Sequence, residues 1–186
     1  MRLAVLADAH GNLPAPEAAL TDAQRHEVDG IIVAGDLTGG PHPGETIRLL
    51  RALGSWMIRG NSPWQQEQVR GLVFNPGAVC GPLNGDTRAQ YALLTWQDHH
   101  WSVEHRAIPY DLDWIRTAFR ASGLLAEGGA LARAFLLSIE TGQNVGTYLL
   151  AHAHRLAAEA GCEGCDVVPD AIWEQAAATF EWEAYT

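Results

Sequence analysis

The fold of this chain is decided by its first stretch, Arg2-Leu-Ala-Val-Leu-Ala-Asp8-Ala-His10-Gly-Asn12. Residues 2–7 form a short and nearly continuous apolar run, which predicts a strand that is buried on both faces. The polar residues Asp8 and His10 follow at the point where this strand ends. The rest of the interpretation starts from this unit, a buried strand followed at once by polar side chains.

The same unit occurs twice more, with a second strand predicted over residues 30–34 that leads into Gly35-Asp36, and a third over residues 55–59 that leads into Gly60-Asn61. Apolar residues at helical spacing separate the three strands, over residues 14–27 and 44–53. Alternating strands and helices imply parallel pairing with right-handed crossovers. An open sheet of this kind binds its ligand at the carboxyl ends of its strands, where the polar residues lie.

The remainder of the chain has a different pattern. Further strands are predicted over residues 69–74, 90–96 and 101–108, the last two joined by a hairpin turn over residues 97–100. Helices are predicted over residues 111–122, 128–140, 144–160 and 169–180. We therefore expect an α/β core over residues 1–110 and a helical C-terminal extension over residues 111–186 that packs on it.

Composition excludes several classes of function. The 186 residues include 12 arginines, no lysine and 22 acidic residues, which gives a net charge of −10. An acidic chain of this kind is not expected to bind nucleic acid or an anionic membrane surface, because both partners need clustered cations. The absence of lysine also excludes Schiff-base chemistry and the phosphate-binding lysine of a P-loop.

The cysteines and the first apolar run predict where the protein works. Three cysteines cannot form a disulfide framework, and residues 2–7 are too short for a signal peptide or a membrane span. We therefore expect a soluble cytoplasmic protein. The acidic charge and the apolar helical tail are compatible with a homo-oligomer.

The polar residues at the strand ends are of the types that bind divalent metal ions. Asp8 and His10 lie two residues apart on an extended strand end, so both side chains can face one ion. Asp36, from the neighbouring strand, could bridge that ion to a second one, for which the Asn61 amide oxygen would be a neutral ligand. Mixed oxygen and nitrogen donors without thiolates suit Mn, Fe or Zn. The structural alternative is that each residue is a cap or a solvated loop residue. This alternative explains any one of these residues more readily than it explains all of them together.

These motifs resemble those of the calcineurin-like metallophosphoesterases, in particular the small bacterial and archaeal phosphodiesterase-type members. The matching segments are Asp8-Ala-His10-Gly-Asn12, Gly35-Asp36-Leu-Thr-Gly39, Arg59-Gly60-Asn61 and Asn75-Pro-Gly77, with Pro82-Leu-Asn-Gly85 and Tyr91-Ala-Leu-Leu94 similar to the closing strands. The resemblance covers about residues 1–125. It implies an α/β fold with a metallophosphoesterase-like β-sandwich flanked by helices.

The resemblance also implies an activity and a ligand set. The activity is hydrolysis of a small phosphodiester or phosphomonoester by metal-activated water at two divalent ions. Asp8, His10 and Asp36 would hold the first ion, and Asp36 would bridge to a second ion held partly by Asn61.

This sequence departs from the family pattern in its centre. The family supplies further histidine ligands between the Gly-Asn and Asn-Pro-Gly motifs, whereas only thirteen residues separate Asn61 from Asn75 here and none is histidine. The chain therefore reads as if a central block were absent between Asn61 and Ser62, by natural deletion, by engineering or by omission from the sequence. Ser62 also stands where the family often has a proton-donating histidine. The alternative to an enzyme is a non-catalytic remnant of this fold that serves as a binding or oligomerisation module.

Other chemistry-bearing residues carry weaker predictions. His42 follows the second strand and could approach the metals, although a plain loop role is favoured. His152 and His154 lie in a helical context, where residues two apart point in different directions and do not chelate one ion. Cys162-Glu-Gly-Cys165 is a lone pair of cysteines after a helix, for which neither a redox nor a metal role is favoured. A flavodoxin-like nucleotide-binding protein is a third possibility for the fold, but the chain has no glycine-rich phosphate turn after its first strand.

Overall fold

The computed structural model describes residues 1–57, 75–162 and 168–185 of the chain. The described residues form an α/β fold with one five-stranded mixed sheet, in the order β3-β2-β1-β4-β5. The strands are β1 (Arg2–Leu6), β2 (Gly30–Val33), β3 (Trp56–Met57), β4 (Ala89–Gln97) and β5 (His100–Ile108). The strand predicted over residues 69–74 lies outside the described residues.

The pairing of the strands confirms the expected topology. β1, β2 and β3 are parallel, whereas β4 pairs antiparallel with both β1 and β5. Val5 of β1 lies opposite Ile32 on one side and Ala92 on the other. β4 and β5 form the predicted hairpin, and its two turn residues, Asp98 and His99, both have positive φ angles (50° and 61°), as a tight two-residue turn requires.

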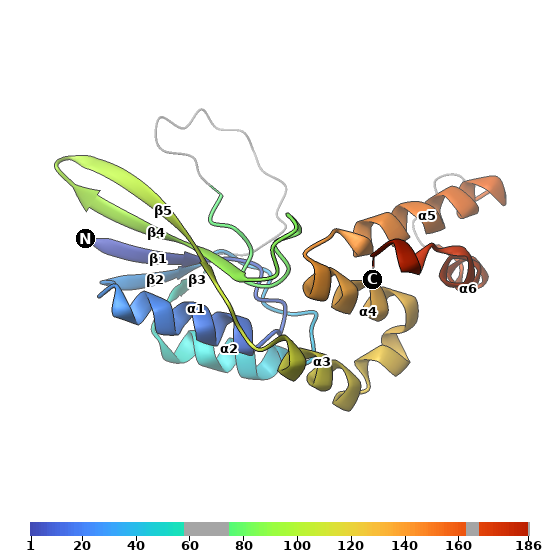
Figure 1. The fold of residues 1–186 in the computed structure, drawn as a ribbon, viewed down its shortest axis with the longest axis horizontal. Helices are drawn as coiled ribbons and strands as arrows, with labels where there is room; N and C mark the ends of the chain where they lie inside the picture. Colours follow the sequence, from blue (N-terminus) through green and yellow to red (C-terminus); the bar gives the residue numbers. More distant parts are fainter. Residues whose placement is uncertain (58–74, 163–167, 186) are drawn as a thin grey trace.

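Two helices cover one face of the sheet. They are α1 (Pro14–Arg25) and α2 (Pro43–Ala52), and each begins with a proline in its first turn, where the missing N–H is not needed. Figure 1 shows both on the same side of the sheet, as two successive right-handed crossovers in one direction require. The core between them and the sheet is built from small residues of α1, such as Ala15 and Ala19, and from larger side chains such as Leu6, Leu50 and Tyr91, all buried. The small α1 residues let the helix approach the sheet closely.

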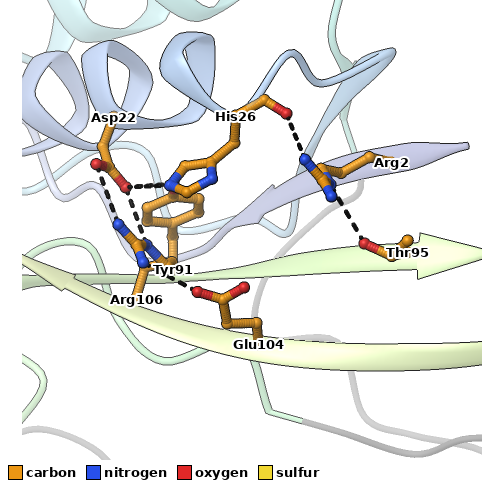
Figure 2. A network of polar contacts seen from close by, with 7 residues as sticks. All are labelled: Arg2, Asp22, His26, Tyr91, Thr95, Glu104 and Arg106. Carbon is orange, nitrogen blue, oxygen red and sulfur yellow. Dashed lines mark hydrogen bonds and ion pairs between the residues drawn. The ribbon is translucent and has the colours of Figure 1, made fainter.

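A polar network crosses this otherwise apolar interface between α1 and the sheet (Figure 2). The buried Asp22 carboxylate of α1 accepts hydrogen bonds from the Tyr91 hydroxyl at 2.8 Å and from Arg106 Nε at 3.1 Å. Arg106 also donates to Glu104 at 2.9 Å, and His26 lies 3.6 Å from Asp22. Because a buried charge is tolerated only when it is paired, this network fixes how α1 sits on β4 and β5.

The C-terminal helices lie beyond one end of the sheet (Figure 1). They are α3 (Leu112–Ala121), α4 (Leu124–Thr141), α5 (Val145–Glu159) and α6 (Asp170–Thr179), followed by the 3-10 helix η1 (Trp182–Tyr185). α4 begins four residues earlier than predicted and is kinked at Gly129, whose φ of 53° and ψ of −132° are not helical. The division into a core of residues 1–110 and an extension of residues 111–186 stays a prediction.

Each helix of this part buries an apolar stripe against a neighbour. Ile115 and Phe119 of α3 pack against Leu136 and Ile139 of α4 in one buried cluster. A second cluster joins α4, α5 and α6 around Leu149. In the described ranges, no helix is both long enough and apolar enough to span a membrane.

Candidate active site

Backbone hydrogen bonds join the loops that follow β1 and β2 at the carboxyl edge of the sheet. The backbone N–H of His10 donates to the Asp36 carbonyl at 2.9 Å, and the N–H of Gly11 donates to the Leu37 carbonyl at 2.9 Å. The two loops approach so closely that a Cβ on Gly40 would lie 2.1 Å from the His10 carbonyl oxygen. Two motifs that are distant in sequence are thus held in a fixed relation by their backbones.

The loop that carries the Asn-Pro-Gly motif fixes the same region from the other side. The N–H groups of Val79 and Cys80 donate to the carbonyls of Ala7 and Asp8 at 2.8 and 2.9 Å. Within the motif, the Asn75 side chain accepts from the Gly77 N–H at 2.9 Å, which closes a turn. The backbone around Asp8 is therefore held by hydrogen bonds from both neighbouring loops.

Three of the four predicted ligands adopt a left-handed backbone conformation. The φ angles of Asp8, His10 and Asp36 are 55°, 44° and 50°. This conformation costs free energy for residues other than glycine, and such residues cluster at functional sites. The fourth predicted ligand, Asn61, lies outside the described residues.

The side chain of His10 is held so that one ring nitrogen is available. Its Nδ1–H donates to the Thr38 carbonyl at 3.0 Å, because a carbonyl oxygen can only accept. Its Nε2 lies 3.8 Å from Asp8 Oδ1, and its ring packs edge-to-face on Phe135 of α4, with the ring centroids 5.6 Å apart. A histidine that binds metal has this arrangement, in which the second nitrogen donates to a carbonyl and orients the ring.

The carboxyl groups of Asp8 and Asp36 lie against each other. The pKa of Asp8 is raised from its ordinary value, first by burial, and the charge of Asp36 and a hydrogen bond with it raise it further, whereas His10 lowers it. Two carboxylates in contact disfavour each other's ionisation unless a cation lies nearby. The structure thus brings Asp8 together with both His10 and Asp36.

These donors match the chemistry of a divalent ion without forming a closed site. Carboxylate oxygens and one imidazole nitrogen suit Mn, Fe or Zn. Within residues 1–57, 75–162 and 168–185, however, no group of three or more His, Cys, Asp or Glu side chains is arranged so that it could hold an ion. The donor types therefore fit, and the described residues alone do not complete the coordination.

A buried polar cluster lies directly behind the site. The Asn12 side chain donates to Cys80 Sγ at 3.3 Å and to the Tyr110 hydroxyl at 3.1 Å. Burial raises the pKa of the Cys80 thiol to about 12, helped by the nearby charge of Asp8, whereas the Asn12 hydrogen bond lowers it. Cys80 is consequently a neutral thiol with a packing role and not a nucleophile.

A pocket opens from Asp8 and His10 toward the C-terminal helices. Its volume is about 810 Å³, which is within the range of small-molecule sites. The Asn-Pro-Gly loop forms one side of the pocket, and Leu131 and Phe135 of α4 with Leu150 of α5 form another. The helical part of the chain therefore contributes to the site, which sequence reasoning missed. The spacing of Leu131, Phe135 and Ser138 on one helical face was the available signal.

The other histidines and the cysteine pair lie elsewhere or have structural partners. His42 precedes α2, lies 3.9 Å from Glu45 and packs on Trp114, and it is not among the residues described as lining the pocket. His152 and His154 lie in α5 as predicted, and His152 bonds to Thr179 and Arg155. His105 lines the pocket but donates to the Asn75 carbonyl at 2.6 Å, so it anchors that loop. Ser62 and Cys165 lie outside the described residues.

Comparisons with known proteins agree with this geometry. A family model described as calcineurin-like phosphoesterase matches residues 1–156. Among solved structures, a metallophosphoesterase from Sphaerobacter thermophilus is similar with a TM-score of 0.58 and 20% identity, over 76% of this chain and 100% of that one. No curated protein matches. The structural likeness confirms the α/β, metallophosphoesterase-like fold, and the family match shows that the chain belongs to the calcineurin-like phosphoesterase family.

Proposed function

We propose that the chain is a metal-dependent phosphoesterase that hydrolyses a small phosphodiester or phosphomonoester at the carboxyl edge of its sheet. The observation that carries this proposal is that Asp8 lies beside both His10 and Asp36, all three in a left-handed conformation, in a chain whose family hydrolyses phosphoesters. Loops that follow the strands of an open sheet are where such folds bind their ligands.

The residues of the site have distinct tasks in this proposal. Asp8 and Asp36 supply the negative charge that retains divalent ions, and His10 supplies a nitrogen donor whose orientation Thr38 fixes. The ions, when bound, would neutralise the charge of the phosphoryl oxygens and lower the pKa of an attacking water. The second ion would take Asn61 as a ligand.

The test is hydrolysis of bis(p-nitrophenyl) phosphate and p-nitrophenyl phosphate after EDTA treatment and re-addition of Mn²⁺. We expect metal-dependent release of p-nitrophenol from at least one ester. Asp8→Asn and Asp36→Asn should each reduce the rate by at least about a hundredfold, because the loss of even an outer partner of a metal ligand reduces activity by about ten- to a hundredfold. Asp98→Asn is the matched control, since Asp98 has the same left-handed φ of 50° in the exposed β4–β5 turn.

The proposal fails if the full chain hydrolyses neither ester with Mn²⁺, Fe²⁺ or Zn²⁺. It also fails if Asp98→Asn reduces the rate as much as Asp8→Asn does, because the loss would then report on folding. Circular dichroism of all variants separates a loss of the site from a loss of structure.

A second candidate function follows from the incomplete ligand set. It is a non-catalytic binding or oligomerisation module, for which the observation is that the described residues alone supply no group of three metal donors. This candidate predicts no Mn²⁺ binding by isothermal titration calorimetry and no effect of Asp8→Asn on self-association. Tight Mn²⁺ binding that Asp8→Asn abolishes would rule it out.

A further inference from the structure

The part of the pocket lining that α4 and α5 supply includes apolar side chains that are partly exposed. Leu131 and Leu150 are 46% and 41% exposed, and the ring of Phe135, which also lines the pocket, packs edge-to-face on the imidazole of His10. A single exposed leucine is ordinary, but two that face a pocket beside an aromatic ring form a continuous apolar surface. This surface, made of Leu131, Phe135 and Leu150, is called the leucine wall below.

The leucine wall is built from one face of each of two helices. Leu131, Phe135 and Ser138 are four and three residues apart on α4, so they share a face. On α5, Thr147 and Leu150 are three residues apart and both line the pocket. Two packed helices hold these side chains, so the wall is a rigid part of the fold.

The charge distribution in the pocket is one-sided. Its described ionisable lining residues are Asp8, His10, His105 beside the Asn-Pro-Gly loop and the neutral thiol of Cys80, and no arginine is among them. A ligand therefore finds its charged partners at Asp8, His10 and His105, whereas Ser138, Asn144 and Thr147 add only neutral polar groups beside the leucine wall. A substituent that carries charge would lose hydration against the leucine wall without gaining a partner of opposite charge there.

We propose that the pocket takes a phosphoester whose substituent is uncharged and apolar, such as an aromatic or branched aliphatic group, and that this group packs on the leucine wall. The inference rests on the proposed function for the position of the phosphoryl group at Asp8 and His10. The volume of about 810 Å³ accommodates a phosphoester with a two-ring substituent. The non-reacting part of the ligand then contributes binding by removing apolar surface of both partners from water.

The test compares two phosphomonoesters that differ only in substituent, 1-naphthyl phosphate and glycerol 1-phosphate, by isothermal titration calorimetry with Mn²⁺ present. We expect the naphthyl ester to bind at least about tenfold more tightly to the wild-type chain. Leu150→Asn should weaken the naphthyl ester by about five- to tenfold and leave the glycerol ester unchanged. Leu53→Asn is the matched control, because Leu53 is 38% exposed at the end of α2 and is not among the described lining residues.

The outcomes separate this inference from the proposed function. Equal affinity for the two esters, no binding of either, or equal effects of Leu150→Asn and Leu53→Asn would overturn the inference. If the two esters bind with equal affinity, or if Leu150→Asn and Leu53→Asn have equal effects, hydrolysis of p-nitrophenyl esters would still support the proposed function. Selective binding of the naphthyl ester without hydrolysis of any ester supports the inference and overturns the phosphoesterase activity.

Discussion

Tyr91→Phe removes one hydrogen bond from the polar network between α1 and the sheet and should destabilise the protein by about 2 kcal/mol. The Tyr91 hydroxyl is fully buried and donates to the Asp22 carboxylate at 2.8 Å. A hydrogen bond to a charged group contributes about 1.5–3 kcal/mol. Phenylalanine fills the same space, so no cavity adds to the loss. For a chain of this size, about 2 kcal/mol lowers Tm by about 4–8 °C.

The acid dependence of this effect follows from the pKa of Asp22. Burial raises that pKa, but hydrogen bonds from Arg106 and Tyr91 and the charge of Arg106 outweigh burial, so the pKa lies below its ordinary value of 3.8. At pH values between the folded and unfolded pKa of Asp22, the folded state therefore binds fewer protons than the unfolded state. The stabilisation is complete above the unfolded pKa and is lost as the pH falls through the folded pKa. Asp22→Asn should lower the free energy of unfolding by about 2–3 kcal/mol at pH 7, because it leaves the Arg106 guanidinium with Glu104 alone. Below pH 4, the free energy of unfolding of this variant should fall less steeply with pH than that of the wild type.

Urea unfolding followed by circular dichroism measures both variants and their double variant at pH 7 and at acidic pH. The two changes share one carboxylate, so their effects should be non-additive by about 1 kcal/mol. Tyr148→Phe is the control, since Tyr148 is 52% exposed, and it should stay within about 0.5 kcal/mol of the wild type. A loss below about 0.5 kcal/mol for Tyr91→Phe, or additivity in the double variant, would refute the network as a coupled unit.

Three further predictions concern the site. Gly40→Ala should reduce the free energy of unfolding in urea by about 1–3 kcal/mol, because the added Cβ would lie 2.1 Å from the His10 carbonyl oxygen. Gly146→Ala is the control, since the space around Gly146 is open, and it should cause no loss. Equal losses for the two variants would contradict the close approach at Gly40. Asp8→Asn should raise the Tm of the metal-free protein at pH 7. The pKa of Asp8 is raised in the folded state, so its ionisation at pH 7 destabilises the folded state, and asparagine removes that cost. A lower Tm for the variant would contradict this reasoning. The buried Cys80 thiol, with a pKa of about 12, should not react with Ellman's reagent until urea unfolds the chain, and its rapid reaction in the native protein would contradict its burial.

The sheet and the loops that follow its first two strands were predictable because local patterns determine them. The continuous apolar run of β1 and the spacing of the next helix and strand define a parallel unit without tertiary information. The position of Asp8 beside Asp36 follows from parallel pairing alone, because the carboxyl ends of neighbouring strands meet at one edge. The chemistry of these side chains then limits the function to a few classes.

The contribution of the C-terminal helices could not be predicted in the same way. The apolar stripe that contains Phe135 shows that α4 buries one face, but periodicity does not say against which part of the chain. The contact between Phe135 and His10 depends on where α3 carries the chain after β5. The sequence predicts a helix over residues 128–140, whereas α4 begins at Leu124 and continues through Gly128 and Gly129 with a kink at Gly129.

Two unfavourable features coincide at the site, and both fit the metal-dependent phosphoesterase proposed above. Left-handed Asp8, His10 and Asp36 each cost about 1–3 kcal/mol in the folded state, and the contact between the two carboxyl groups adds electrostatic repulsion. A module that only packs or assembles needs neither feature, since asparagine or glycine at these positions would relieve both. The backbone hydrogen bonds between the loops hold the strained arrangement in place, so the geometry is a property of the fold. In the phosphoesterase proposed above, a divalent cation between the carboxylates would offset this repulsion.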